Sequence, residues 1–282
     1  MFVFQKELPV QGFCLHHFAS LESTNDAAKN FYQEHETGSL WPIHVFWADE
    51  QTKGRGRMGR TWVSDLGNLY VSFLMRSLVC SSERISELSF VFGCAVYKAL
   101  EICLGNGGEL LKLKWPNDIL VGQAKIAGIL LESEIWPMAT PQISEKQPIN
   151  PWVIMGTGIN LNSAPSNLSY ATTCLLQEGM RLNSSYGVPS VYDFLKILCM
   201  KLKEFIETWG KEGFLVIREL WLSKAAFLGE KISVNVGRKK IAGIFEGIDE
   251  RGFLILRTET QMETISSGNI WLERDDENDF SS

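Results

Sequence analysis

The chain has 282 residues, of which 45% are hydrophobic and 21% are charged, and its formal net charge is −6. These proportions are typical of a globular protein and argue against a disordered or fibrous one. The acidic balance provides no overall positive field, so non-specific binding to DNA or RNA is not expected. The length suits one large domain and a smaller one.

The sequence gives no sign of export or of a membrane anchor. The first residues, MFVFQKELPVQGF, lack the basic start, apolar run and cleavage site of a secretory signal. No apolar run reaches the roughly 18 residues of a membrane span. We therefore expect a cytoplasmic protein with no membrane partner.

The cysteines and histidines do not form a recognisable metal motif. Adjacent His16 and His17 point to opposite faces of a strand, so they suit one metal ion poorly. No C-x-x-C pair occurs among the six scattered cysteines, which are Cys14, Cys80, Cys94, Cys103, Cys174 and Cys199. Neither a disulfide framework nor a zinc knuckle is indicated, and we expect core thiols.

The first half of the chain alternates predicted helices and strands. The stretch LESTNDAAKNFYQEH predicts a helix that Ser23 or Thr24 can cap. Apolar runs at 43–48 and 68–75 predict strands on either side of a glycine-rich string. Helical spacing of apolar residues over 83–104 predicts a long buried helix that ends at a glycine-rich turn.

The second half continues the sheet and then changes character. Three apolar runs predict successive strands of one sheet, at 110–115, 126–135 and 151–162. The proline-spotted segment 136–150 is expected on the surface, and a helix over 191–209 is expected to end at Gly210. From Gly229 onward, five short alternating runs broken by glycines predict a small β-barrel.

The string GRGRMGRT, residues 54–61, matches two phosphate-binding patterns and fits neither. The dinucleotide fingerprint and the P-loop both need a helix directly after the glycines, and the P-loop also needs Lys where Arg60 stands. Here TWVSDLGNLYVSF follows, which predicts a turn and a strand. A solvated basic loop and a loop that closes over a phosphate or carboxylate both remain open on this stretch alone.

A second polar cluster, KWPNDILVGQAKIAGIL at 114–130, places Asn117 and Asp118 before a turn at Gly122 and Lys125 after it. Further segments accompany it in order: ESTND at 22–26, DEQTKGRGRMGRTW at 49–62, GNLYVS at 67–72, KIAGILLE at 125–132 and MGTGINLN at 155–162. Together with the C-terminal run from GEKISV at 229–234 to AGIFEGIDERGFLILRT at 242–258, these segments make the chain resemble the biotin protein ligases. The resemblance covers about residues 15–272.

The resemblance implies an α+β fold. It consists of a mixed sheet with helices, related to the class II aminoacyl-tRNA synthetase core, and a small C-terminal SH3-like β-barrel. The corresponding division is a catalytic domain at 1–224, the barrel at 225–274 and an acidic disordered tail at 275–282. Too few residues precede Ser23 for the DNA-binding domain of many bacterial members, so a form without DNA binding is expected. A homodimer is a further expectation from the family.

The implied reaction joins biotin to ATP, giving biotinyl-5'-AMP, and passes biotin to one lysine of a biotin carboxyl carrier protein, a subunit of acetyl-CoA carboxylase. Lys125, Arg55 and Arg57 are the implied catalytic residues. The implied biotin-binding set is Ser23, Thr24, Asn25, Gln51, Gly54, Arg55, Arg57, Lys125, Gly128 and Gly156. The implied ATP-binding set is Arg57, Arg60, Trp62, Asn117, Lys125 and Asn160. Asp118 is the candidate Mg²⁺ ligand, although a structural turn carboxylate is an equal interpretation, and Trp62 also suits a core position.

Two other functions remain open at this point. Lipoate-protein ligases share the adenylation chemistry. They lack the basic glycine string, so the string favours biotin over lipoate as the substrate of this chain. A non-catalytic biotin-binding adaptor or regulator would use the C-terminal barrel without needing Lys125 for its function. Release of pyrophosphate with biotin, and not with lipoate, distinguishes these functions.

Overall fold

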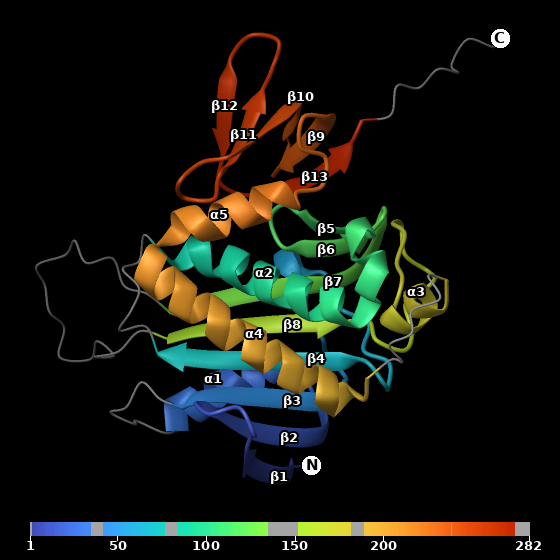
Figure 1. Ribbon diagram of the computed structural model, residues 1–282, viewed down its shortest axis with the longest axis vertical. Helices are drawn as coiled ribbons and strands as arrows, with labels where there is room; N and C mark the ends of the chain where they lie inside the picture. Colours follow the sequence, from blue (N-terminus) through green and yellow to red (C-terminus); the bar gives the residue numbers. More distant parts are fainter. Residues whose placement is uncertain are drawn as a thin grey trace, which may run out of the picture.

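Two β-sheets organise the protein, and helices cover the larger of them (Figure 1). The computed structural model describes residues 2–34, 42–76, 84–134, 152–181, 189–237 and 239–273. The predicted surface segment 136–150 and the acidic tail 275–282 lie outside these residues. None of the described helices is long and apolar enough to cross a membrane.

The larger sheet has eight strands in the order β1-β2-β3-β4-β8-β7-β6-β5. Their bounds are Phe2–Glu7 (β1), Phe13–Leu21 (β2), Ile43–Gln51 (β3), Leu69–Arg76 (β4), Leu111–Lys114 (β5), Asp118–Val121 (β6), Ala124–Glu134 (β7) and Trp152–Ile159 (β8). Only β2 and β3 pair in parallel, and the other neighbours are antiparallel. The predicted mixed sheet is therefore confirmed.

Helices lie on both faces of this sheet, because its strands alternate apolar side chains toward two cores. Helix α1 (Thr24–Glu34) covers one face, where Ala28 packs with Phe46 and Ile154. On the other face lie α2 (Ile85–Leu104), α4 (Val191–Glu212) and α5 (Phe214–Ser223), as Figure 1 shows. The remaining short helices are α3 (Leu175–Arg181), η1 (Arg57–Gly59) and η3 (Gly105–Leu110).

One predicted helix end was wrong. Helix α4 continues through Gly210 to Glu212 and ends at Gly213, whose φ of 81° is the left-handed conformation that glycine adopts without strain. A glycine inside a helix costs only about 1 kcal/mol relative to alanine, so the packing of the apolar face carries the helix past Gly210. Strand β1 was not predicted at all.

The smaller sheet confirms the five predicted C-terminal strands but not their closure. It contains β9 (Lys231–Val236), β10 (Lys239–Ile248), β11 (Leu254–Arg257), β12 (Met262–Ile265) and β13 (Asn269–Leu272), in the order β12-β11-β10-β9-β13. The two outer strands, each four residues long, lie at opposite edges and do not pair with each other within the described chain. The result is an open antiparallel sheet rather than a barrel.

Hydrogen bonds fasten the smaller sheet to the larger unit. The indole of Trp115 donates to the carbonyl of Gly252 at 3.0 Å, and the Arg218 guanidinium donates to the carbonyl of Ile248 at 2.7 Å. Residues 224–226 also pair with Leu113 of β5. The predicted domain boundary at 224/225 therefore falls in a segment bonded to the larger sheet, and the division itself stays a prediction.

Candidate functional site

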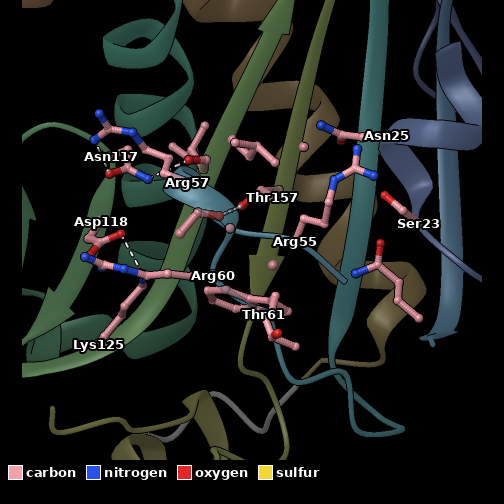
Figure 2. A pocket seen from close by; sticks show the side chains of 18 of the residues that line it. Ser23, Asn25, Arg55, Arg57, Arg60, Thr61, Asn117, Asp118, Lys125 and Thr157 are labelled. Atoms are coloured by element: carbon pink, nitrogen blue, oxygen red, sulfur yellow. Dashed lines mark hydrogen bonds and ion pairs between the residues drawn. The ribbon is translucent and has the colours of Figure 1, made fainter. Parts of the chain in front are cut away.

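A pocket opens where the string 54–61 lies across the larger sheet, and Figure 2 shows its lining. The start of α1 and the end of β3 form one end of the pocket, and β6 and β7 form the other. Thirteen of the fifteen predicted site residues line it: Ser23, Thr24, Asn25, Gln51, Arg55, Arg57, Arg60, Trp62, Asn117, Asp118, Lys125, Gly128 and Gly156. Residues as far apart in sequence as Ser23 and Gly156 thus meet as the resemblance implies.

The two remaining predicted residues lie outside the pocket lining. Gly54 is buried just behind it, where a Cβ would come within 3.0 Å of Gln51 and closer still to Trp62 and Ser64. Asn160 is also buried, and its side-chain amide donates to the carbonyl of Thr173 at 3.0 Å. Asn160 therefore holds the chain that follows β8.

The 54–61 string is a compact loop and not the start of an α-helix. Backbone bonds from Gly56 to Arg60 and from Trp62 to Gly54 close it, and its only helical turn is η1, where Met58 has a φ of 56°. The next regular element is β4 at Leu69. Rejection of the dinucleotide fingerprint and of the P-loop is thereby confirmed, because both need helix amides facing the phosphate.

Neutral polar side chains form one end of the pocket, which we call the polar end: Ser23, Thr24, Asn25 and Gln51. The Gln51 carbonyl oxygen accepts from the backbone amide of Thr24 at 2.9 Å and from its hydroxyl at 3.1 Å. The Gln51 amide nitrogen donates to Ser64 at 3.3 Å. Because Gln51 is held on both sides, its side-chain orientation is set before any ligand arrives.

Behind the polar end lies a network that sequence reasoning did not identify. The Ser72 hydroxyl, fully buried on β4, lies 2.7 Å from the Thr24 hydroxyl and also bonds Asn25. The Asn25 amide donates to Glu132 at 2.7 Å. Ser72 and Glu132 both belong to segments that carry the family resemblance. Their place in those segments was the one indication in the sequence that they belong to the site.

Arg55 of the loop extends to this same end (Figure 2). It donates two hydrogen bonds to Asp26 at 2.6 and 2.8 Å and reaches Glu132 at 3.4 Å. The hydrogen bonds to Asp26 raise the pKa of Arg55 above its usual value, so the guanidinium is charged. Asp26, a residue of the ESTND segment, therefore binds one side of the loop to α1.

The opposite end of the pocket, which we call the cationic end, contains Arg57, Arg60, Asp118 and Lys125. Lys125 forms an ion pair with Asp118 at 2.7 Å, and its Nζ lies 5.2 Å from the centre of the Trp62 ring. The antiparallel hairpin of β6 and β7 produces this pair, because Lys125 lies opposite Leu120, which is two residues from Asp118 and on the same face of the sheet. The predicted cluster around KWPND is thus brought together as expected.

Arg57 reaches neutral partners only, among the residues that the structure describes. Its guanidinium donates to Asn117 at 3.1 Å and to the carbonyl of Gly268 in the smaller sheet at 3.4 Å. Burial lowers the pKa of Arg57, with Asp118 acting in the opposite direction. A half-buried cation that faces neutral acceptors is suited to an incoming anion, since the anion would offset the cost of its partial burial.

Trp62 lines the pocket and packs against the backbone of Gly128 and Gly158. A Cβ on Gly158 would come within 2.3 Å of this indole, and one on Gly156 within 2.2 Å of Asn25, so glycine at both positions makes the packing possible. The indole nitrogen of Trp62 is buried and has no hydrogen-bond partner in the described part of the chain. It is therefore a buried donor left unsatisfied against the backbone of Gly158, where a Cβ would come within 2.4 Å of it.

Comparison with known protein families identifies two regions of the chain. Residues 17–142 match the biotin/lipoate A/B protein ligase family, and residues 227–272 match the biotin protein ligase C-terminal domain. The biotin--[acetyl-CoA-carboxylase] ligase of Paracoccus denitrificans is 34% identical over 83% of this chain and 91% of its own length. The bifunctional ligase/repressor BirA of Escherichia coli is 28% identical over 80% of this chain, which spans 65% of that relative.

Solved structures agree with the sequence matches. The biotin protein ligase from Aquifex aeolicus, in complex with biotin and ATP, aligns with a TM-score of 0.70 at 27% identity, over 92% of this chain and 98% of that one. The Leishmania major biotin protein ligase, in complex with biotinyl-5-AMP, shares the fold with a TM-score of 0.62 at 23% identity, over 90% and 98% of the two chains.

Proposed function

This chain belongs to the biotin protein ligase family, and we propose that both steps of the ligase reaction take place in the pocket beneath residues 54–61. The protein is a ligase that activates biotin by adenylation with ATP and transfers it to a carrier protein. The pocket's division into a polar end and a cationic end is the observation that supports this proposal. A neutral ring and a charged reaction centre need these two environments.

The ureido ring of biotin is proposed to bind at the polar end. The ring is neutral and carries both donors and acceptors, so it needs partners of both kinds. Ser23 and Thr24 provide hydroxyls, and Gln51 provides an amide held by Thr24 and Ser64. Because Ser23 and Thr24 are buried and Gln51 is held by hydrogen bonds, an acid without a matching polar ring would leave these groups unsatisfied.

The carboxylate of biotin and the α-phosphate of ATP are proposed to meet at the cationic end. A carboxylate oxygen attacks the α-phosphorus, and the bond from this phosphorus to the β-bridging oxygen breaks, so pyrophosphate leaves with that electron pair. Lys125 and Arg57 stabilise the negative charge that accumulates there, and Arg60 lies on the same side of the pocket. Trp62 and Asn117 are proposed to contact the nucleotide.

In the second step the amine of a carrier lysine attacks the acyl carbon of the adenylate, and AMP departs. We propose the biotin carboxyl carrier subunit of acetyl-CoA carboxylase as the acceptor, on the basis of the name of the Paracoccus relative. A cytoplasmic location and a homodimer stay predictions.

Asp118 suits a Mg²⁺ ion that accompanies ATP. It is the one carboxylate among the described lining residues of this pocket, and only its Oδ1 is engaged, by Lys125. Mg²⁺ is commonly held by one or two carboxylates together with substrate phosphates, so the single free oxygen fits. The ion would neutralise charge on the phosphate oxygens. Asp118 would at the same time keep Lys125 beside the reaction centre.

The proposal is tested by incubating the purified chain with ATP, Mg²⁺ and either biotin or lipoate, and measuring pyrophosphate release. A carrier domain is then added and its mass is determined. We expect release with biotin only, and a mass increase of one biotin that disappears when the acceptor lysine is changed to arginine. Release with lipoate and none with biotin would reassign the substrate, and biotin binding without release would indicate a non-catalytic binder.

A further inference from the structure

Three potential metal ligands gather on the face of the larger sheet that α1 covers, far from the pocket. The sulfur of Cys14 and ring nitrogens of His16 and His44 all lie within 4.8 Å of one another. His16 Nε2 is 2.9 Å from His44 Nδ1. Cys14 and His16 are buried, and His44 is half-buried.

The pairing of β2 with β3 produces this cluster. Cys14 and His16 are two residues apart on β2 and therefore face the same side of the sheet. The parallel register places His44 of β3 directly beside Cys14. His17 points to the opposite face, where it contacts Asp49 at 2.9 Å and stacks on Trp47. The adjacent pair His16 and His17 is indeed unsuited to one metal, but His44 replaces His17.

Aromatic rings enclose the two imidazoles. Phe46 stacks on His16 with ring centres 4.6 Å apart and planes 7° apart. Phe31 of α1 lies 4.9 Å from His16 and 4.6 Å from His44. Such an apolar surround fixes the orientation of the rings and limits the access of water, which strengthens metal–ligand bonds.

We propose that Cys14, His16 and His44 form a Zn²⁺ site. One thiolate and two imidazoles are the ligands that zinc prefers, whereas Mg²⁺ and Ca²⁺ need oxygen. Zinc bonds of about 2.0–2.3 Å place tetrahedral donor atoms roughly 3–4 Å apart, so small side-chain rotations complete the geometry from the observed positions. Binding releases the thiol proton of Cys14 to solvent, and the fourth position remains for a water or another side chain.

The site lies at the opposite end of β2 and β3 from the pocket. Cys14 and His44 are near the start of these strands, whereas Gln51 ends β3, so roughly 20 Å separates the two sites along the strands. Helix α1 begins at the pocket and carries Phe31 back over the imidazoles. Zinc would therefore stabilise the packing of α1 on the sheet without taking part in the ligase reaction.

The test uses the full chain, freed of metal with a chelator, and titrates it with Zn²⁺ in competition with a chromophoric chelator. We expect one zinc per chain, and a loss of affinity of about 100-fold or more in both Cys14→Ser and His44→Gln. His17→Gln is the matched control, since this neighbouring histidine faces away from the cluster, and it should retain the affinity. The unfolding temperature should rise with zinc in the wild type and in His17→Gln only.

Substitution with Co²⁺ identifies the metal ligands by absorption spectroscopy in the wild-type protein, so this test does not depend on how well the variants fold. A thiolate-to-cobalt absorption band together with tetrahedral visible bands is expected in the wild type. Absence of the thiolate band in the wild type overturns the proposal. So does a zinc affinity that Cys14→Ser and His44→Gln both retain, because the metal would then be bound elsewhere.

Discussion

The two ends of the pocket differ in how their side chains are satisfied. At the polar end, Thr24 bonds Gln51 directly, and Ser72 links Thr24 to Asn25. Ser64 and Glu132 bond the outer members of this network, Gln51 and Asn25. At the cationic end, three cations of the lining, Arg57, Arg60 and Lys125, face Asp118, the one carboxylate of the described lining. The first end is arranged for recognition of a neutral group, and the second has positive charge in excess for an incoming anion. Changes at the two ends should therefore alter different kinetic constants.

The largest effect is expected for Lys125→Ala at the cationic end. Loss of one prearranged donor at a developing charge costs roughly 10²–10³ in rate, so adenylation at saturating substrates should fall by that factor. Biotin affinity should change little, because the ring contacts remain. Single-turnover pyrophosphate release measures the rate, and calorimetry measures the binding of biotin.

Lys112→Ala is the control for Lys125→Ala, because Lys112 lies on β5 outside the lining of the pocket. It should leave the rate unchanged. If Lys125→Ala slows adenylation less than about tenfold, or unfolds the protein at assay temperature, Lys125 is structural and the contrast between the two ends fails at its main point.

Ser72→Ala should have the opposite kinetic signature at the polar end. It removes a fully buried hydroxyl and leaves oxygens of Thr24 and Asn25 without this partner, which costs about 1–3 kcal/mol. The KM for biotin should rise about tenfold, since 1.4 kcal/mol is a factor of ten, while the KM for ATP stays constant. Steady-state kinetics with each substrate varied in turn provides the measurement.

Ser233→Ala is matched to Ser72→Ala, since Ser233 is a buried serine of the smaller sheet that donates to Glu273. It should lower stability without altering either KM. Equal increases in the KM for biotin and for ATP in Ser72→Ala would mean that the hydroxyl supports the whole pocket and not the polar end alone.

The sequence predicted the residues of both ends better than their bonding. Lys125, Asn117 and Gln51 belong to contiguous segments whose order is distinctive, so their convergence in one pocket was foreseeable. The network of Ser72, Asn25 and Glu132 was not, because it depends on side-chain contacts between β4, α1 and β7. A serine on an apolar strand carries no sign of such partners.

The same limit applies to the fold. Apolar periodicity located most strands and helices, since burial of one face leaves a local trace in the sequence. Strand pairing is non-local, so the parallel register that brings His44 to Cys14 left no pattern along the chain. The open form of the smaller sheet and the passage of α4 beyond Gly210 are likewise decided by tertiary packing, which overrides local preference.

A smaller effect is expected for Asp26→Asn, which tests the role of Arg55, the loop cation that lies at the polar end. The Arg55–Asp26 pair is 40% exposed on both sides, so its loss costs about 0.2–1 kcal/mol. If Asp26 holds the loop over biotin, the KM for biotin should rise by a factor of about 1.4 to 5 while the adenylation rate at saturation is unchanged. A lower KM would show instead that Asp26 competes with biotin for Arg55. Lys53 also pairs with an acidic residue, Glu22, so Glu22→Gln is a control with exposed charge and no place in the lining.

The smallest kinetic effect is expected for Ser190→Ala. This variant tests whether the stability of the fold can change without altering the polar end or the cationic end of the pocket. The Ser190 hydroxyl caps α4 by accepting from the Asp193 amide at 3.1 Å, and its removal should cost about 1 kcal/mol in urea unfolding. Hydrogen bonds from Lys196 and from Ser190 hold the pKa of Asp193 below its ordinary 3.8. A carboxylate whose pKa is lower in the folded than in the unfolded protein stabilises the fold at pH values above its unfolded pKa. This stabilisation is lost as the pH falls through the folded pKa, so the difference in unfolding free energy between Ser190→Ala and the wild type should shrink below about pH 4.

Both KM values and the adenylation rate should stay within about twofold of the wild type, because α4 does not line the pocket. A change in the KM for biotin would mean that stability lost at a distance reaches the polar end, and the effects of Ser72→Ala would then need correction for it.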